Sequence, residues 1–205
     1  ATGDFKFCPK LPRSLTHYGR LELNARVYDH LDACTLLGKH LGPNHLQLSP
    51  KFGPERLPEI LNLLNEWPRE IPFALELRHL DWFNGSPAFE HVLEAMAAKQ
   101  QPMIMTDTPG RRDVLHGYLS APSVFIRFKA HGEHPTDLER IRAWSTRIGQ
   151  WLQLGLRALY FIVHSPGEQR APEVCNLVSE QLQRDHGLRH NKWAPAESAQ
   201  ESLFD

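Results

Sequence analysis

The sequence predicts an α/β protein in which βα units repeat around a parallel sheet. Short runs of β-branched and aromatic residues alternate with longer segments of 3.6-residue periodicity, a pattern typical of such units. The chain has 205 residues, 41% of them hydrophobic, and a net charge of −1. This length and composition suit one globular domain with a sizeable core.

Six strands are expected from the apolar runs, and amphipathic helices from the segments between them. The expected strands are residues 4–8, 45–48, 73–77, 103–106, 124–128 and 159–163. The expected helices are residues 21–41, 54–67, 87–99, 136–154 and 172–185, with a shorter one at 113–119. Proline or threonine at several helix starts fits the first helical turn.

Composition excludes several classes of protein. The balanced charge argues against a disordered chain, a basic nucleic-acid coat and an acidic tail protein. No apolar run approaches the ~20 residues of a membrane span, and no signal pattern begins the chain, so a cytoplasmic protein without membrane contact is expected. Cys8, Cys34 and Cys175 form no C-x-x-C pair. We interpret them as buried thiols rather than disulfides or zinc ligands.

Polar side chains occupy alternate positions within the expected strands. In residues 73–79, Glu76 and Arg78 share the face opposite Phe73 and Leu75, and Arg127 occupies a similar position in a later strand. In a barrel of parallel strands such residues face inward near the mouth. Polar residues from all six strand ends converge in this way, at Lys10, Gln47, Glu76, Arg78, Asp107, Arg127, Lys129, His131 and His164.

Two interpretations of these charges stay open. Glu76 with Arg127, or Asp107 with Arg78, can pair to fill the interior. Alternatively, the set forms a ligand site whose excess of cations favours an anion. Arg111 and Arg112, before the short helix at 113–119, either join such a site or belong to a solvated loop.

Motifs near the strand ends follow one another in a specific order. They are FKFCPKLPR at 5–13, LTH at 15–17, LGP at 41–43, LQLSP at 46–50, ELRH at 76–79, WF at 82–83, TD at 106–107, IRF at 126–128, HG at 131–132, YF at 160–161 and His164. With this order and spacing, residues 4–184 resemble the YecE-like family, catalogued as domain of unknown function 72. The resemblance implies a TIM-like (β/α) barrel with parallel strands and no established activity.

The chain differs from that family in two respects. Family members usually begin with two further βα units, so about six of the eight units of a barrel are expected here, in a domain over residues 1–187. An incomplete barrel exposes sheet edges, and self-association through them is expected. The sixth strand ends in Val163-His164-Ser165-Pro166, where many relatives carry an asparagine pair.

The first functional hypothesis is an enzyme acting on a phosphorylated or nucleic-acid-derived ligand at the barrel mouth. Glu76 or Asp107 is the candidate general base, and His131 or His164 the candidate acid or metal ligand. The most specific version of this hypothesis is metal-assisted phosphodiester hydrolysis, with a divalent metal as candidate cofactor. The residues assigned to ligand binding are Lys10, Arg13, Gln47, Arg78, His79, Trp82 and Arg127.

The second hypothesis is a non-catalytic module that binds an anionic ligand or single-stranded nucleic acid. Trp82, Phe83 and Tyr118 lie near the arginines in the sequence, where they either stack on a base or pack within their loops. A third hypothesis is that a chain lacking two units has no activity.

Residues 188–205 are expected to form a flexible C-terminal tail. Gln200, Leu203 and Phe204 match the short peptide by which bacterial DNA-processing proteins bind the sliding clamp, although Glu201 replaces the usual leucine. An unremarkable tail is the alternative interpretation.

Overall fold

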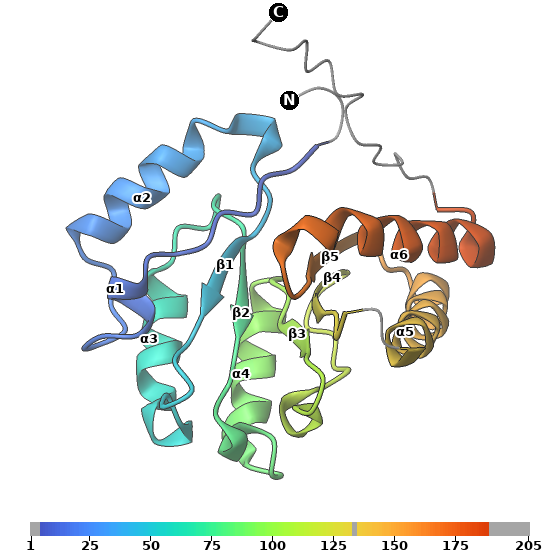
Figure 1. Ribbon diagram of the computed structural model, residues 1–205. Helices are drawn as coiled ribbons and strands as arrows, with labels where there is room; N and C mark the ends of the chain where they lie inside the picture. The colour runs from blue at the N-terminus through green and yellow to red at the C-terminus, as the bar shows by residue number, and fades with distance from the viewer. Residues whose placement is uncertain (1–4, 133–134, 189–205) are drawn as a thin grey trace, which may run out of the picture. The chain divides into compact units, whose positions relative to one another are not determined.

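The computed structural model of the chain describes residues 5–132 and 135–188 (Figure 1). The predicted tail peptide, with Gln200, Leu203 and Phe204, lies outside this part. The described strands and α-helices follow one another in the order α1 (Arg13–Thr16), α2 (Ala25–Thr35), β1 (Asn44–Gln47), α3 (Leu57–Glu66), β2 (Phe73–Glu76), α4 (Pro87–Ala98), β3 (Ile104–Asp107), β4 (Ser123–Lys129), α5 (Pro135–Gln153), β5 (Ala158–His164) and α6 (Ala171–His186). None of the described helices is both long and apolar enough to cross a membrane.

The described strands form two sheets. β1 pairs with β2 in parallel, with Gln47 opposite Glu76. The second sheet has the order β3-β4-β5, and its β3–β4 ladder is parallel, with Thr106 opposite Arg127. A parallel bridge from Leu75 to Met103 connects β2 to the start of β3. The α/β class with parallel strands is therefore confirmed, whereas no closed sheet is found among the described residues.

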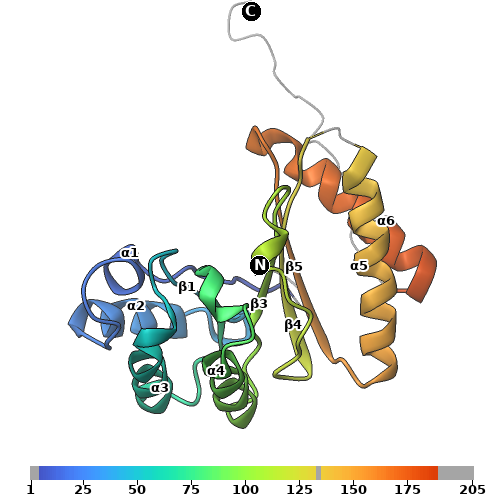
Figure 2. The ribbon, with the colours of Figure 1, turned by 90° about the horizontal axis from the view of Figure 1, so that it is seen from below.

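The chain folds as two compact units. The first comprises Ala1–Lys129 and Leu154–Ile162, and the second Ala130–Gln153 and Val163–Asp205. In the first unit α3 packs against α4, and in the second α5 packs against α6 (Figure 2). The β5 strand passes from the first unit into the second.

The first expected strand does not form as such. Residues 5–10 instead make two isolated parallel bridges, from Phe7 to Leu41 and from Lys10 to His45. Pro9 lies between them and lacks an N–H, so it contributes only its carbonyl, which accepts from the backbone N–H of His45. Lys10 is still placed beside β1.

Two expected helices are shorter than predicted. Helix α2 begins only after Asn24, whose side chain accepts a hydrogen bond from the backbone N–H of Val27. At residues 113–119 the structure has a 3₁₀ turn, Arg112–Val114, followed by extended chain. There His116 and Tyr118 both contact the Phe89 ring, an i, i+2 arrangement that extended chain allows and a helix does not.

The two faces of the sheets in the first unit differ in character. One face packs on helices: Leu46 and Leu75 join a core with Leu31 of α2 and Ile60 of α3. The opposite face, here called the inner face, carries the apolar cluster of Ala74, Ile104 and Phe125, with Cys8, Tyr160 and Ile162 packed against it. Period-2 alternation then places His45, Gln47, Glu76, Thr106 and Arg127 on the inner face as well.

Candidate functional site

The candidate site is built around Glu76, the last residue of β2. Strand alternation directs Leu75 into the helix-covered core and Glu76 onto the inner face. Glu76 is 0% exposed to solvent. Burial of an unpaired carboxylate costs several kcal/mol, so its hydrogen-bond partners determine whether this arrangement is stable.

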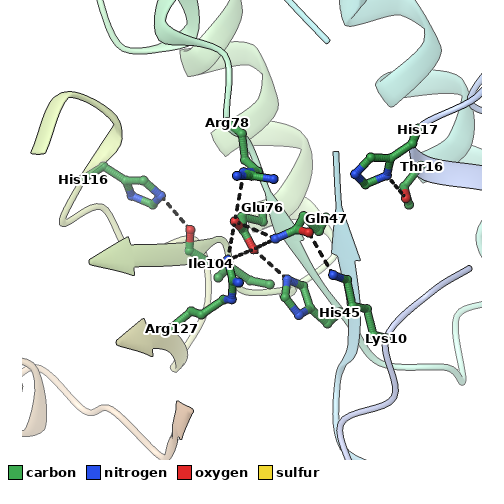
Figure 3. Close-up of polar contacts among 10 residues, drawn as sticks. All are labelled: Lys10, Thr16, His17, His45, Gln47, Glu76, Arg78, Ile104, His116 and Arg127. Atoms are coloured by element: carbon green, nitrogen blue, oxygen red, sulfur yellow. Dashed lines mark hydrogen bonds and ion pairs between the residues drawn. The ribbon is translucent and has the colours of Figure 1, made fainter. Parts of the chain in front are cut away.

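Three neighbouring side chains hydrogen-bond to the Glu76 carboxylate (Figure 3). His45 Nε2 lies 2.7 Å from Oε2, and Gln47 Nε2 donates to Oε1 at 3.0 Å and to Oε2 at 2.9 Å. Arg127 donates a guanidinium N–H to Oε1 at 3.1 Å. Arg78 adds an ion pair, with its Nε 3.7 Å from Oε1. We call these five residues together with Lys10 the Glu76 cluster.

These contacts keep Glu76 ionised. Burial alone raises the pKa of this carboxyl, but the hydrogen bond from His45 and the charge of Arg127 outweigh it and lower the pKa to about 2. At neutral pH Glu76 therefore carries a negative charge and can only accept hydrogen bonds.

The ionised carboxylate fixes the proton arrangement of His45. Because Glu76 has no proton to donate, the proton between the two groups must lie on His45 Nε2. In the same way, both contacts from Gln47 Nε2 to Glu76 fix the orientation of the Gln47 amide.

The outer part of the cluster is cationic. Lys10 Nζ donates to Gln47 Oε1 at 2.9 Å. Partial burial and the charges of Arg127, Arg78 and Arg13 lower the pKa of Lys10, whereas Glu76 raises it. Burial, together with Arg13, Lys10 and Arg78, also lowers the pKa of His17. Four cations, Lys10, Arg13, Arg78 and Arg127, therefore act electrostatically on the region around one carboxylate.

The inner face also holds an unsatisfied hydroxyl. Thr106 stands opposite Arg127 in the β3–β4 register and is 8% exposed. Its Oγ1 is buried without a hydrogen-bond partner in the described part of the protein. A buried hydroxyl normally finds a partner, so a polar atom of a ligand or a water can be accommodated there.

The structure brings together most of the residues expected to bind a ligand, but not all of them. Lys10, Gln47, Arg78 and Arg127 belong to the Glu76 cluster, and Arg13 lies close enough to influence Lys10. Trp82 does not present a stacking surface: it is 0% exposed, and its indole N–H donates to the Phe52 carbonyl.

Two other expected site residues make only local contacts. His79 accepts a hydrogen bond from the backbone N–H of Asp81 through Nδ1. Asp107 stands opposite Phe128, so it lies on the helix-covered side and not on the face of Arg127. Its carboxylate pairs with Arg112 at 3.0 Å, so Arg112 is engaged in an ion pair of its own loop. The expected pairing of Glu76 with Arg127 does occur.

His131 and His164 belong to the second unit. The backbone N–H of His131 donates to both carboxylate oxygens of Asp137, and the His164 carbonyl accepts from the Ala130 N–H. These bonds shape the loop that leads into α5. Within residues 5–132 and 135–188, no three histidine, cysteine or carboxylate side chains gather as metal ligands.

Sequence reasoning missed two residues of the site, His45 and Thr106. His45 lies two positions before Gln47, so alternation within the strand could have placed both on one face. Thr106 was missed because Asp107 was assigned to the inner face without considering that adjacent strand residues point to opposite sides.

Comparison with known proteins places the chain in a family. The model of the family described as "Protein of unknown function DUF72" matches residues 1–200. Two relatives match almost the whole chain: the UPF0759 protein YecE of Escherichia coli O157:H7 and that of Escherichia coli strain K12. Each is 26% identical to this chain, and each alignment covers 99% of this chain and 80% of the relative.

Two crystal structures of a DUF72 family protein have a fold similar to that of this chain. A crystal structure of a DUF72 family protein from Enterococcus faecalis V583 superposes with a TM-score of 0.69 and 18% identity, covering 90% of this chain and 79% of that one. A second crystal structure of the same protein gives a TM-score of 0.67 over 94% of this chain and 78% of that one. From the motifs, the parallel βα arrangement and these matches, we conclude that the chain belongs to the DUF72 family.

Proposed function

We propose that the Glu76 cluster binds a small anionic ligand, of which a phosphorylated metabolite is the favoured class. The observation that carries this proposal is the charge imbalance: Lys10, Arg13, Arg78 and Arg127 act on a region that contains one buried carboxylate. Glu76 offsets only one of these charges. Three positive charges remain, and a ligand carrying one or two negative charges would offset part of this excess.

The accessibility of the cations supports the same proposal. Arg127 is the inner partner of Glu76, with a side chain 16% exposed, whereas the side chain of Arg78 is 37% exposed and Lys10 is also exposed. The buried contacts therefore hold the cluster together, while the outer cations remain open to a ligand. Guanidinium and ammonium groups provide the donors that phosphate oxygens require.

The ligand is a small molecule rather than a nucleic-acid strand in this proposal. Stacking on bases requires exposed aromatic faces beside the cations. Trp82 is fully buried. Tyr118 is 60% exposed but packs edge-on against Phe89 with a centroid separation of 5.7 Å, and the exposed Tyr18 ring already has the Arg13 guanidinium 5.9 Å from its centroid. No three-residue set of metal donors occurs among the described residues, so we assign recognition of the anion to the cations themselves.

We further propose that the inner face lines a TIM-like barrel. Cys8 and Tyr160 both pack against the Ala74, Ile104 and Phe125 cluster, although they come from opposite ends of the first unit's sequence. Such packing is what a curved parallel sheet produces. In this arrangement the Glu76 cluster would stand at the carboxyl ends of the strands, where ligands of such barrels bind.

Calorimetric titration with inorganic phosphate and with ribose 5-phosphate tests the proposed binding. We expect Arg78→Gln to weaken phosphate binding about tenfold, which corresponds to the loss of one charge-assisted contact. The matched control is Arg111→Gln, which removes an exposed cation paired with Asp113 outside the cluster. Failure of phosphate to bind at millimolar concentration, or equal losses in the two variants, would refute the proposal.

A further inference from the structure

Lys10 differs from an ordinary salt-bridging lysine in the partner of its amine. Its Nζ donates to an amide oxygen, Gln47 Oε1, at 2.9 Å. In the part of the chain that the structure describes, no carboxylate lies within ion-pair distance of this amine. The nearest charged groups that influence it are mainly guanidinium groups.

The contact with Gln47 is built into the cluster. Gln47 Nε2 is held by both oxygens of Glu76, which leaves Oε1 directed to Lys10 (Figure 3). The amide therefore positions the amine without adding a negative charge beside it. Gln47 and Glu76 are both buried, so this arrangement is rigid, whereas Lys10 itself is exposed.

The surroundings increase the neutral, nucleophilic fraction of the amine. Burial and the charges of Arg127, Arg78 and Arg13 lower the pKa of Lys10, and together they outweigh Glu76, which raises it. Cationic neighbours are a known way of activating a lysine toward carbonyl compounds. The same cations would hold the anionic group of a ligand beside it.

We propose that Lys10 is an amine nucleophile that forms a Schiff base with a carbonyl ligand whose phosphate group is held by Arg78 and Arg13. This inference rests on the proposed anion-binding function. Gln47 acts as a positioning residue in it, because it touches the amine and not the ligand.

The step balances without any further reactant. The Nζ lone pair attacks the carbonyl carbon, a C–N bond forms, and the carbonyl oxygen takes up a proton while Nζ releases one to solvent. The resulting hydroxyl group then takes up a second proton and leaves as water while the C=N bond forms, which gives a protonated imine. Release of the remaining Nζ proton to solvent gives the neutral imine. Amine and carbonyl compound thus give an imine and one water, with no change in oxidation state.

Reductive trapping tests the proposal on the full chain. The protein is treated with glycolaldehyde phosphate and sodium cyanoborohydride at neutral pH, and the secondary amine formed at each lysine is measured by peptide mass spectrometry. We expect Lys10 to be labelled several-fold faster than Lys51 or Lys99, because its lowered pKa leaves a larger fraction of the amine neutral at the pH of the experiment. Unphosphorylated glycolaldehyde should show a smaller preference for Lys10.

Three variants distinguish imine formation at Lys10 from electrostatic binding of the phosphate group alone. Lys10→Arg keeps the positive charge but has no primary amine, so the dominant adduct should disappear. Arg78→Gln should slow labelling of Lys10 by glycolaldehyde phosphate, whereas Arg111→Gln should leave it unchanged. Inorganic phosphate should protect Lys10 in the unmodified protein.

The outcomes distinguish the two proposals. If phosphate binds but Lys10 is labelled no faster than Lys51, the Schiff-base inference is wrong and anion binding stands. If phosphate neither binds nor protects Lys10, both proposals fail, because the inference requires the anion site. Rapid labelling of Lys10 that phosphate prevents and Arg78→Gln slows supports both.

Discussion

His45 and Glu76 are joined by a 2.7 Å contact between Nε2 and Oε2, across the register of β1 and β2. This contact does two things at once. It helps to keep a fully buried carboxylate ionised, and it requires the shared proton to lie on His45 Nε2. The inner face of the sheet is therefore organised around one negative charge.

Removal of that charge should destabilise the fold. In Glu76→Gln the partly buried Arg127 and the buried His45 lose the negative charge that they contact, and we expect the free energy of unfolding to fall by about 3–5 kcal/mol at pH 7. Urea unfolding followed by circular dichroism measures the loss. Glu173→Gln, which breaks an exposed pair with Arg170, is the control and should cost less than about 1 kcal/mol. Similar values for the two variants would contradict the central role of Glu76.

The lowered pKa of Glu76 predicts a specific acid sensitivity. The folded-state pKa is about 2 against an ordinary value of 4.5, so the stabilisation is complete above pH 4.5 and is lost as the pH falls toward 2. The amount lost should be on the order of 3 kcal/mol. Unfolding curves measured from pH 6 to 2 should show this slope in the unmodified protein and a shallower one in Glu76→Gln. Parallel curves would contradict the assignment.

His116 predicts a second pH effect, at higher pH. Burial lowers the pKa of this imidazole to about 4, and its Nε2 contacts the Ile104 carbonyl at 3.2 Å. Nδ1 is buried and has no hydrogen-bond partner among the residues that the structure describes. Between pH 6.5 and 4 the unfolded chain binds a proton that the folded chain excludes, so stability should fall by about 3 kcal/mol as the pH decreases.

The variant that tests this effect is His116→Phe. Phenylalanine can keep the ring contacts with Phe83 and Phe89 and does not titrate. We expect the slope of unfolding free energy against pH to decrease between pH 6.5 and 4, while the Glu76 effect below pH 4.5 remains. If the slope in the upper range is unchanged, another group is responsible for it.

Asp107 should be dispensable for ligand binding. It stands opposite Phe128 and pairs with Arg112, so it does not share the inner face with Arg127. We expect Asp107→Asn to leave the dissociation constant for phosphate unchanged within about twofold, because the lost negative charge lies on the opposite face and acts mainly on Arg112. Calorimetric titration against the Arg78→Gln variant gives the comparison, and a loss as large as that of Arg78→Gln would contradict the assigned geometry.

The sequence allowed most of the inner face to be predicted, because alternation within a strand is a local property. Glu76 and Arg78 opposite Leu75 follow directly from period 2, and so does Arg127 in β4. The same reasoning failed at Asp107 because a shift of one residue reverses the face. The register of Thr106 opposite Arg127 depends on pairing between strands, which periodicity alone does not supply.

The partners of Trp82 and His116 could not be predicted for a different reason. Trp82 lies next to charged residues in the sequence, but its indole reaches the Phe52 carbonyl, 30 residues away. His116 falls in a segment whose spacing suggested a helix, and its extended form is stabilised by rings from Phe83 and Phe89. Tertiary packing decides such cases, and a single sequence holds little information about it.

The pairing of Glu76 with Arg127 has a consequence for the order in which the protein is synthesised. The two residues are separated by 51 positions, so Glu76 leaves the ribosome well before the arginine that neutralises it. Until β4 has emerged, β2 would have to bury its carboxylate with His45, Gln47 and the partly exposed Arg78 as partners, without the shorter contact from Arg127. A nascent chain that ends before Arg127 should therefore remain sensitive to protease, and resistance should appear when that residue has left the exit tunnel.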